Sequence, residues 1–291
     1  DGGVQALIIA TSTIDGDLTL RTGDSNGITD DGTVTVGGNF SATTDANAGV
    51  INMGTMAVDG SFTLAPNGSG AVTIVNDAGL TLAASTMGGT FSGTATTGNI
   101  TDTGALAITG TTTLVTSADG GTIALDVATN AFTGAMTITT NDSSGTDADV
   151  TIDGGTTALV IAASTIDGDL TLTSGNASGI TDSGTLTVGG NFSATTDANN
   201  GVINVGTMAV DGTVALNTNG NGAATIVNDA GLNFAASTVG GALSATATTA
   251  NITDTGALAI TGTTTLVTSA DDATIALDVA TNAFTGAMTI T

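Results

Sequence analysis

The chain has 291 residues, of which 40% are hydrophobic, and carries 26 acidic residues against a single cation, Arg21, for a net charge of −25. Binding to nucleic acid and docking on anionic lipid both depend on clusters of Lys and Arg, so neither partner is expected. The chain has no His and no Cys, which excludes Ser-His and Cys-His nucleophiles.

The first elements along the chain are short runs in which apolar and polar residues alternate. They cover residues 14–20, 28–40 and 50–62, and Gly, Asn or Asp separates them. Alternation with a period of two places Val34 and Phe40 on one face of a strand and the intervening Thr and Ser residues on the other. These runs therefore predict half-buried β-strands joined by tight turns.

Further runs of the same kind follow at residues 87–91, 100–110 and 132–138. The single proline, Pro66, stands in a turn-like stretch, Ala-Pro-Asn-Gly. No segment has apolar residues at the 3.6-residue spacing of a long helix, and no apolar run reaches the roughly 18 residues of a membrane helix. We expect an all-β protein without membrane insertion.

The strongest signal is a tandem repeat with a period of 152 residues. Residues 1–139 align without a gap to residues 153–291, and 110 of the 139 aligned positions are identical. Where apolar positions differ, as from Phe62 to Val214, the side chain stays apolar, as an interior position requires. We divide the chain into a first repeat, 1–152, and a second, truncated repeat, 153–291, continuous with the first.

Each long repeat contains about six shorter units of 20–30 residues. One unit cannot bury its apolar face alone, whereas stacked units share a continuous core. The pattern predicts a parallel β-helix, or β-solenoid, with about six coils per 152-residue repeat. The predicted core comprises these residues and their counterparts 152 positions later: Val34, Val36, Phe40, Val58, Phe62, Leu106 and Ile108. The alternative is an array of small β-sandwiches, which usually contain more large aromatic residues than the seven Phe present here.

The runs Gly-Thr-Val/Leu-Thr-Val-Gly-Gly-Asn-Phe-Ser at residues 32–41 and 184–193 resemble the repetitive passenger regions of bacterial surface adhesins, of the filamentous-haemagglutinin-like and autotransporter-like kinds. The resemblance lies in the general pattern of such runs, without a diagnostic motif, and it extends along the whole chain. It implies a right-handed β-helix exported to the cell surface.

One acidic stretch is a candidate metal site. Asp142, Asp147, Asp149 and Asp153 place four carboxylates within a dozen residues, and calcium prefers several oxygen ligands. The spacing fits neither an EF-hand loop nor the calcium-binding nonapeptide repeat. The alternative is a solvated acidic turn without metal. Apart from calcium, no cofactor is expected.

Catalysis is not expected. The triplets Asp-Thr-Gly at residues 102–104 and 254–256 match the aspartic-protease motif, but equivalent turns at residues 30–32 and 182–184 indicate that they are corners of coils. Paired runs of Thr suggest an ice-binding solenoid as an alternative function, although the intervals between units vary. A calcium-dependent surface-layer or ligand-binding solenoid is a further alternative.

Both ends of the chain lie in mid-pattern, so we expect further repeats on either side, in one long chain or as copies stacked head to tail. The expected function is an extracellular structural or adhesive filament at the cell surface. Its expected partners are further copies of itself, and calcium or host and cell-surface ligands. The high negative charge would keep such a filament soluble, and a chain with one Arg and no Lys offers trypsin-like proteases a single target.

Overall fold

The structure is a computed structural model that describes residues 1–45, 48–141 and 145–291. It divides into two compact units, residues 1–148 and 149–291. The described residues form strands and turns and include no helix. In particular, the described segments contain no helix long and apolar enough to cross a membrane.

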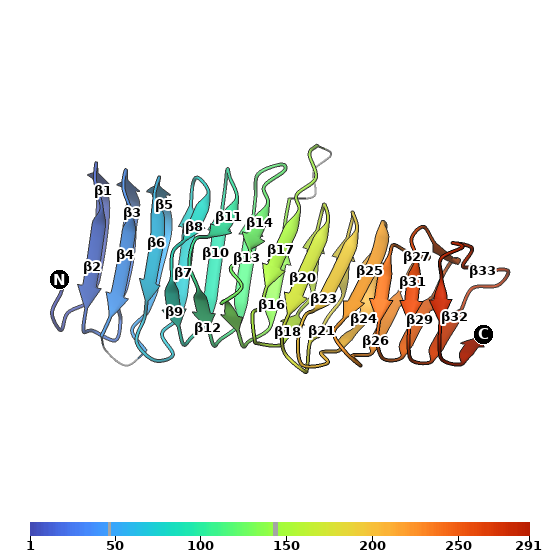
Figure 1. The fold of residues 1–291 in the computed structure, drawn as a ribbon. Helices are drawn as coiled ribbons and strands as arrows, with labels where there is room; N and C mark the ends of the chain where they lie inside the picture. The colour runs from blue at the N-terminus through green and yellow to red at the C-terminus, as the bar shows by residue number, and fades with distance from the viewer. Residues whose placement is uncertain (46–47, 142–144) are drawn as a thin grey trace. The chain divides into compact units, whose positions relative to one another are not determined.

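The strands of the first unit pair in parallel within three sheets, and the chain passes from sheet to sheet as it winds (Figure 1). The first sheet consists of β1 (Leu7–Ile14), β3 (Ile28–Val36), β5 (Ile51–Val58), β7 (Val72–Asn76), β10 (Phe91–Ala95), β13 (Thr112–Thr116) and β16 (Met136–Thr139). The second consists of β2 (Leu18–Thr22), β4 (Phe40–Thr44), β6 (Ser61–Ala65), β8 (Leu80–Leu82), β11 (Ile100–Asp102) and β14 (Ile123–Leu125). The third consists of β9 (Ser85–Met87), β12 (Leu106–Ile108) and β15 (Ala131–Phe132).

The second unit is built in the same way. Its first sheet consists of β18 (Leu159–Ile161), β21 (Ile180–Asp182), β24 (Ile203–Val210), β26 (Ala224–Asn228), β29 (Leu243–Ala247), β32 (Thr264–Thr268) and β35 (Met288–Ile290), and β22 (Leu186–Val188) links β19 (Ser164–Ile166) to β24. The other series consists of β17 (Val150–Asp153), β20 (Leu170–Ser174), β23 (Phe192–Thr196), β25 (Thr213–Thr218), β27 (Leu232–Phe234), β30 (Ile252–Asp254) and β33 (Ile275–Ala276). From β25 a branch leads to β28 (Ser237–Val239), β31 (Leu258–Ile260) and β34 (Ala283–Phe284).

This architecture confirms the predicted parallel β-helix. One coil takes between 19 residues, from Val72 to its partner Phe91, and 24 residues, from Thr112 to its partner Met136. The first sheet of residues 1–148 contains seven described strands, close to the six or so coils expected for one repeat.

Alternation along each strand determines the core. In β4, for example, Phe40, Ala42 and Thr44 point inward and are buried, and the residues between them are half-exposed. All seven predicted core residues and their counterparts in the second repeat are at most 2% exposed. Phe40 and Phe62 lie next to each other in successive coils, and their ring centroids are 5.7 Å apart. The rings are tilted relative to each other, which is an arrangement that aromatic pairs favour.

The path of the coil changes partway through each unit. In the first three coils, the strands β1, β3 and β5 continue beyond an irregularity in register into a second segment. In this segment Ser12, Val34 and Met56 lie in register. The fourth coil lacks this segment and turns at residues 76–79 into β8. A new strand position then begins with β9. We call this change of path the step, and residues 208–228 repeat it in the second unit.

Glycine is required at one corner of the coil. Gly27 has a φ of 75°, and a Cβ there would collide with the carbonyl oxygen of Val50 in the next coil. Gly179 has a φ of 62° and meets Val202 in the same way. An L-residue with a side chain would be strained and would push the coils apart.

Candidate functional site

A buried asparagine caps the strand edge at each step. The backbone N–H of Val58 donates to Oδ1 of Asn76 (2.8 Å), and Nδ2 of Asn76 donates to the carbonyls of Val58 (3.0 Å) and Gly79 (2.6 Å). The Asn76 side chain thus takes the place of the missing strand. Asn76 is fully buried, so these bonds satisfy groups that water cannot reach.

The second repeat contains the same cap. Asn228 accepts from the Val210 amide (2.8 Å) and donates to the carbonyls of Val210 (3.0 Å) and Gly231 (2.6 Å). The backbone N–H of Asp229 completes the edge by donating to the Met208 carbonyl (2.8 Å). The step is therefore a closed end of one strand series and leaves these edge groups paired.

The step leaves a hollow on the surface of each unit. In the first unit it has a volume of about 280 Å³ and is lined by Thr33, Gly54, Thr55, Met56, Val75, Asp77 and Thr96. In the second it has about 260 Å³ and is lined by the seven residues 152 positions later: Thr185, Gly206, Thr207, Met208, Val227, Asp229 and Thr248. Each hollow combines an apolar floor with hydroxyls and one carboxylate. We call these the step hollows.

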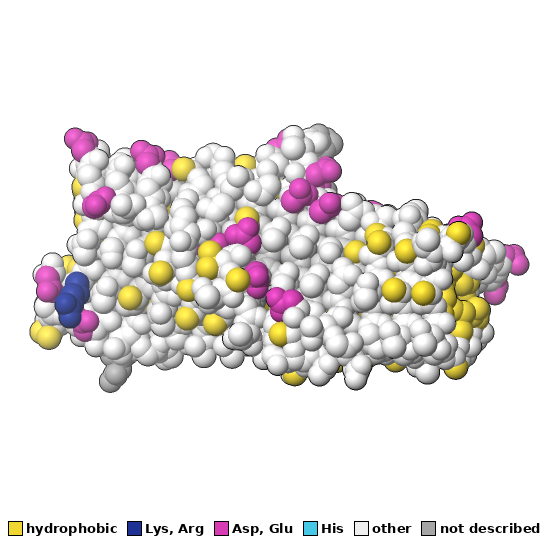
Figure 2. All heavy atoms as spheres, viewed as in Figure 1, with side chains coloured by type: hydrophobic (Ala, Val, Ile, Leu, Met, Phe, Trp, Pro, Cys, Tyr) yellow, Lys and Arg dark blue, Asp and Glu magenta, His cyan; other side chains and the backbone are white. Residues whose placement is uncertain are grey.

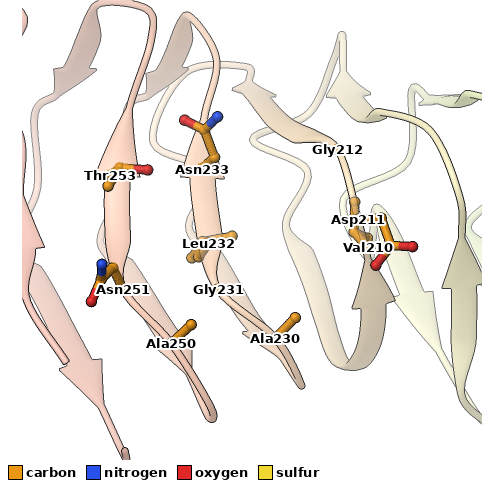
Figure 3. A pocket seen from close by; sticks show the side chains of 10 residues that line it. All are labelled: Val210, Asp211, Gly212, Ala230, Gly231, Leu232, Asn233, Ala250, Asn251 and Thr253. Atoms are coloured by element: carbon orange, nitrogen blue, oxygen red, sulfur yellow. The ribbon is translucent and has the colours of Figure 1, made fainter. Parts of the chain in front are cut away.

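A third hollow, of about 310 Å³, lies in the second unit (Figure 3). Asp211 lies on one side of it, and Asn233 and Thr253, on two adjacent strands, lie on the other. Among the residues that the structure describes, the buried Oδ1 atom of Asn233 finds no hydrogen-bond partner. The first repeat has Thr81 at the position of Asn233.

Several carboxylates bind the backbone of the following coil. Asp30 accepts from the backbone amides of Gly54 (2.9 Å) and Thr55 (2.7 Å) and from the Thr55 hydroxyl (2.5 Å). Partial burial raises the pKa of Asp30, but these hydrogen bonds outweigh it, so the pKa lies below its usual value. Asp182 makes the same contacts with Gly206 and Thr207.

The Asp-Thr-Gly triplets also have a structural role. Asp102 accepts from the Asp126 amide (3.2 Å) and from Nδ2 of Asn130 (2.6 Å), whose Oδ1 accepts from the Leu106 amide (2.8 Å). Burial raises the pKa of Asp102 above its usual value, and the hydrogen bonds only partly offset this. Asp254 has equivalent bonds to the Asp278 amide and to Asn282. These contacts hold the corner of the next coil.

The four predicted metal ligands are divided among different parts of the chain. Asp142 lies outside the described residues, and Asp147 is exposed near the end of the first unit. In the second unit, Asp149 accepts from the Asp169 amide (2.8 Å) and Asp153 from the Gly155 amide (2.8 Å). The part of the chain that the structure describes contains no group of three or more potential metal-ligating side chains. The calcium site stays a prediction.

Most side chains on the surface carry no charge, and nearly all of the charged ones are carboxylates. On the face drawn in Figure 2, the carboxylates are scattered in small groups, and one cationic group is visible. Arg21 Nε donates to Asp45 (2.6 Å), and both side chains are largely exposed. In the second repeat, Thr173 replaces Arg21, so the coil does not depend on this ion pair.

Sequence reasoning missed the residues that build the step. Asn76 ends the run Val72-Thr-Ile-Val-Asn, in which Val72, Ile74 and Asn76 all fall on the inward face. A polar residue at an inward position was the available signal. Ser85 gave a similar signal: its hydroxyl accepts from the Leu64 amide (2.9 Å) and donates to the Ala83 carbonyl (2.9 Å).

Comparison with known proteins gives one match. The family model for repeats of unknown function (DUF5649) matches residues 69–139 and 221–291, two segments separated by the 152-residue period. In each unit the matched segment begins just before the step and covers the coils that follow it. No curated protein and no solved structure matches the chain. The tandem-repeat organisation is thus supported, and the coils after each step are similar to this family of repeats.

Proposed function

We propose that this protein is a structural or adhesive filament of the cell surface, built from stacked β-solenoid coils. The observation that carries the proposal is the parallel pairing of successive coils within each unit. Leu18, Phe40 and Phe62, for example, stack one above the other in successive coils. A repeat that adds coils in one direction builds length, and it leaves the sides polar and acidic.

Side-chain hydrogen bonds between coils support the same function. Asp169 accepts from the Asn191 amide (2.6 Å), and Asn191 Oδ1 accepts from the Thr213 amide (2.8 Å), which links three coils in the second unit. In the first unit, Asp17 and Asn39 make the corresponding bonds to Asn39 and Ser61. Such ladders stiffen a rod and do not form a catalytic centre.

The coil that contains β33, β34 and β35 presents an apolar hollow of about 350 Å³. It is lined by Leu266, Ile275, Leu277, Phe284, Met288 and Ile290, and hydrophobic side chains gather at this end in Figure 2. Their counterparts in the first repeat, which include Met136 and Ile138, are buried. A coil of another copy stacked against this hollow would bury it in the same way.

Electron microscopy and sedimentation of the 291-residue chain test this proposal. We expect concentration-dependent rods, and we expect Met288→Asp with Ile290→Asp to abolish them, since two charges would be buried in the contact. Thr113→Asp, on the outward face of β13, is the control and should leave assembly unchanged. Compact monomers at every concentration, or equal loss in the control, would contradict the proposal.

One observation favours a second candidate, ice binding. Thr73, Ser92, Thr113 and Thr137 lie in register on the outward face of the first sheet of residues 1–148. Such a column presents one hydroxyl on each of four successive coils. The neighbouring column contains Val75 and other apolar residues as well as Thr, so the pattern is incomplete. A measurement of thermal hysteresis separates this candidate from the filament, which should show none.

A further inference from the structure

We infer that the two step hollows are binding sites for a lysine side chain of a partner protein. Each hollow lies within one unit, so the inference does not depend on self-association. The hollows measure about 280 and 260 Å³. Small-molecule sites usually have about 300–1,000 Å³, so these hollows suit a single side chain better than a whole small molecule.

The chemistry of the lining matches a long aliphatic side chain that ends in a cation. Val75 is half-exposed and supplies the accessible apolar surface, and Met56 lies buried beside it. The exposed residue Asp77 lines the same hollow. A lysine side chain places its methylene groups on apolar surface and keeps its ammonium group near polar atoms. The hollow offers both kinds of surface. Met208 and Asp229 provide the equivalent groups in the second unit.

The carboxylates of the hollows are free to bind. In the part of the chain that the structure describes, Asp77 is engaged only through its backbone: its N–H donates to Met56 and its carbonyl accepts from the Thr96 hydroxyl (2.8 Å). This contrasts with Asp30, whose carboxylate accepts three hydrogen bonds. The backbone of Asp229 makes the same contacts, with Met208 and Thr248.

The hollow also contains the acceptors that an ammonium group needs. An ammonium has three donors and no acceptor. The Asp77 carboxylate and the hydroxyl oxygens of Thr33 and Thr96 line the same hollow. The Thr96 hydroxyl gives its proton to the Asp77 carbonyl, so its lone pairs point away from that bond and can accept.

Charge favours a basic partner over any other. The net charge of −25 attracts cations to the whole surface, and the chain itself offers one cationic side chain, already paired with Asp45. The occupant therefore comes from outside this chain.

Methyl NMR of the full chain tests the inference, because the methionine methyl groups of Met56 and Met208 report on the two hollows. The probe is lysine with its α-amino group acetylated and its carboxyl group converted to a methylamide. All four methionines named here are buried, but only Met56 and Met208 line a step hollow, so we expect a saturable shift of their signals and no shift of Met87 and Met136. The norleucine analogue, which lacks the ammonium group, should have no effect.

Substitution of Asp77 then tests whether its carboxylate binds the ammonium group of the probe. Asp77→Asn should raise the probe's dissociation constant at Met56 by about fivefold, the effect of a unit charge pair at about 4 Å in water. The response of Met208 should persist and show that the variant is folded. Asp197→Asn removes an equal charge outside both hollows and should change neither signal. An equal response to norleucine, or unchanged binding in Asp77→Asn, would overturn the inference.

Discussion

The two repeats differ at a stacked pair of core residues in a way that predicts a rescue experiment. Phe62 lies next to Leu82 in the adjacent coil, and the second repeat has Val214 next to Phe234 at the same place. All four side chains are fully buried. The phenylalanine of the pair is in the earlier coil in the first repeat and in the later coil in the second repeat. The two pairs of side chains therefore fill a similar volume.

From this arrangement we expect Phe62→Val and Leu82→Phe to destabilise the protein singly and to compensate each other. Phe62→Val leaves a cavity and breaks the ring pair with Phe40, at a cost of about 2–3 kcal/mol. Leu82→Phe overpacks the same layer at a cost of about 1–3 kcal/mol. In the double variant the ring of residue 82 occupies the cavity, so the coupling should recover at least about 1 kcal/mol.

Urea unfolding followed by circular dichroism measures the four free energies of unfolding for this cycle. The control combines Phe62→Val with Leu125→Phe, another buried leucine of the second sheet three coils away, and these effects should add. If the Phe62 and Leu82 substitutions also add without coupling, the swap between the repeats does not reflect packing, and the reasoning fails.

Four further outcomes are expected. Asn76→Ala should cost roughly 2–6 kcal/mol in urea unfolding, because two buried backbone groups lose their partners, whereas the exposed Asn39→Ala should cost less than about 1 kcal/mol since water replaces its bonds. Gly27→Ala should lower the melting temperature strongly, whereas Gly16→Ala, where a Cβ meets nothing, should not. Since the folded pKa of Asp30 is lowered, its contribution to stability is present above about pH 3.9 and is lost as the pH falls through the folded value, so Asp30→Asn should destabilise at pH 7 but not in strong acid. At low ionic strength, calcium should raise the melting temperature more than an equal ionic strength of sodium, and equal effects would count against specific binding.

Local sequence pattern could predict most of this fold because each strand carries its own alternation. Val34, Val36 and Phe40 face inward wherever their coil sits, since the side-chain period of a strand does not depend on its neighbours. The 152-residue period added that the same core recurs. The first prediction needs only short-range information and the second only a comparison of the sequence with itself, and the burial of these residues and their counterparts confirms both.

The step could not be predicted because it depends on contacts between coils. Asn76 is 18 residues from Val58 in the sequence, and only the register of the stack brings its amide group to that strand edge. Asn76 marks a polar inward position, but the alternation is the same before and after the step, so the pattern does not show that one strand position ends there and another begins. The step hollows follow from that change of path and were missed with it.

The buried caps bear on how such a protein can associate. Unpaired strand edges recruit other strands, and a solenoid that changes its path exposes one wherever a strand series ends. Here Asn76 pairs with both backbone groups of Val58, and the Asp77 amide pairs with the Met56 carbonyl, so the end of the series offers no free edge group at these positions. The acidic sides repel like surfaces. With these edge groups closed, strand pairing between copies would not start at the step, and the proposed filament would require it along the direction in which the coils stack.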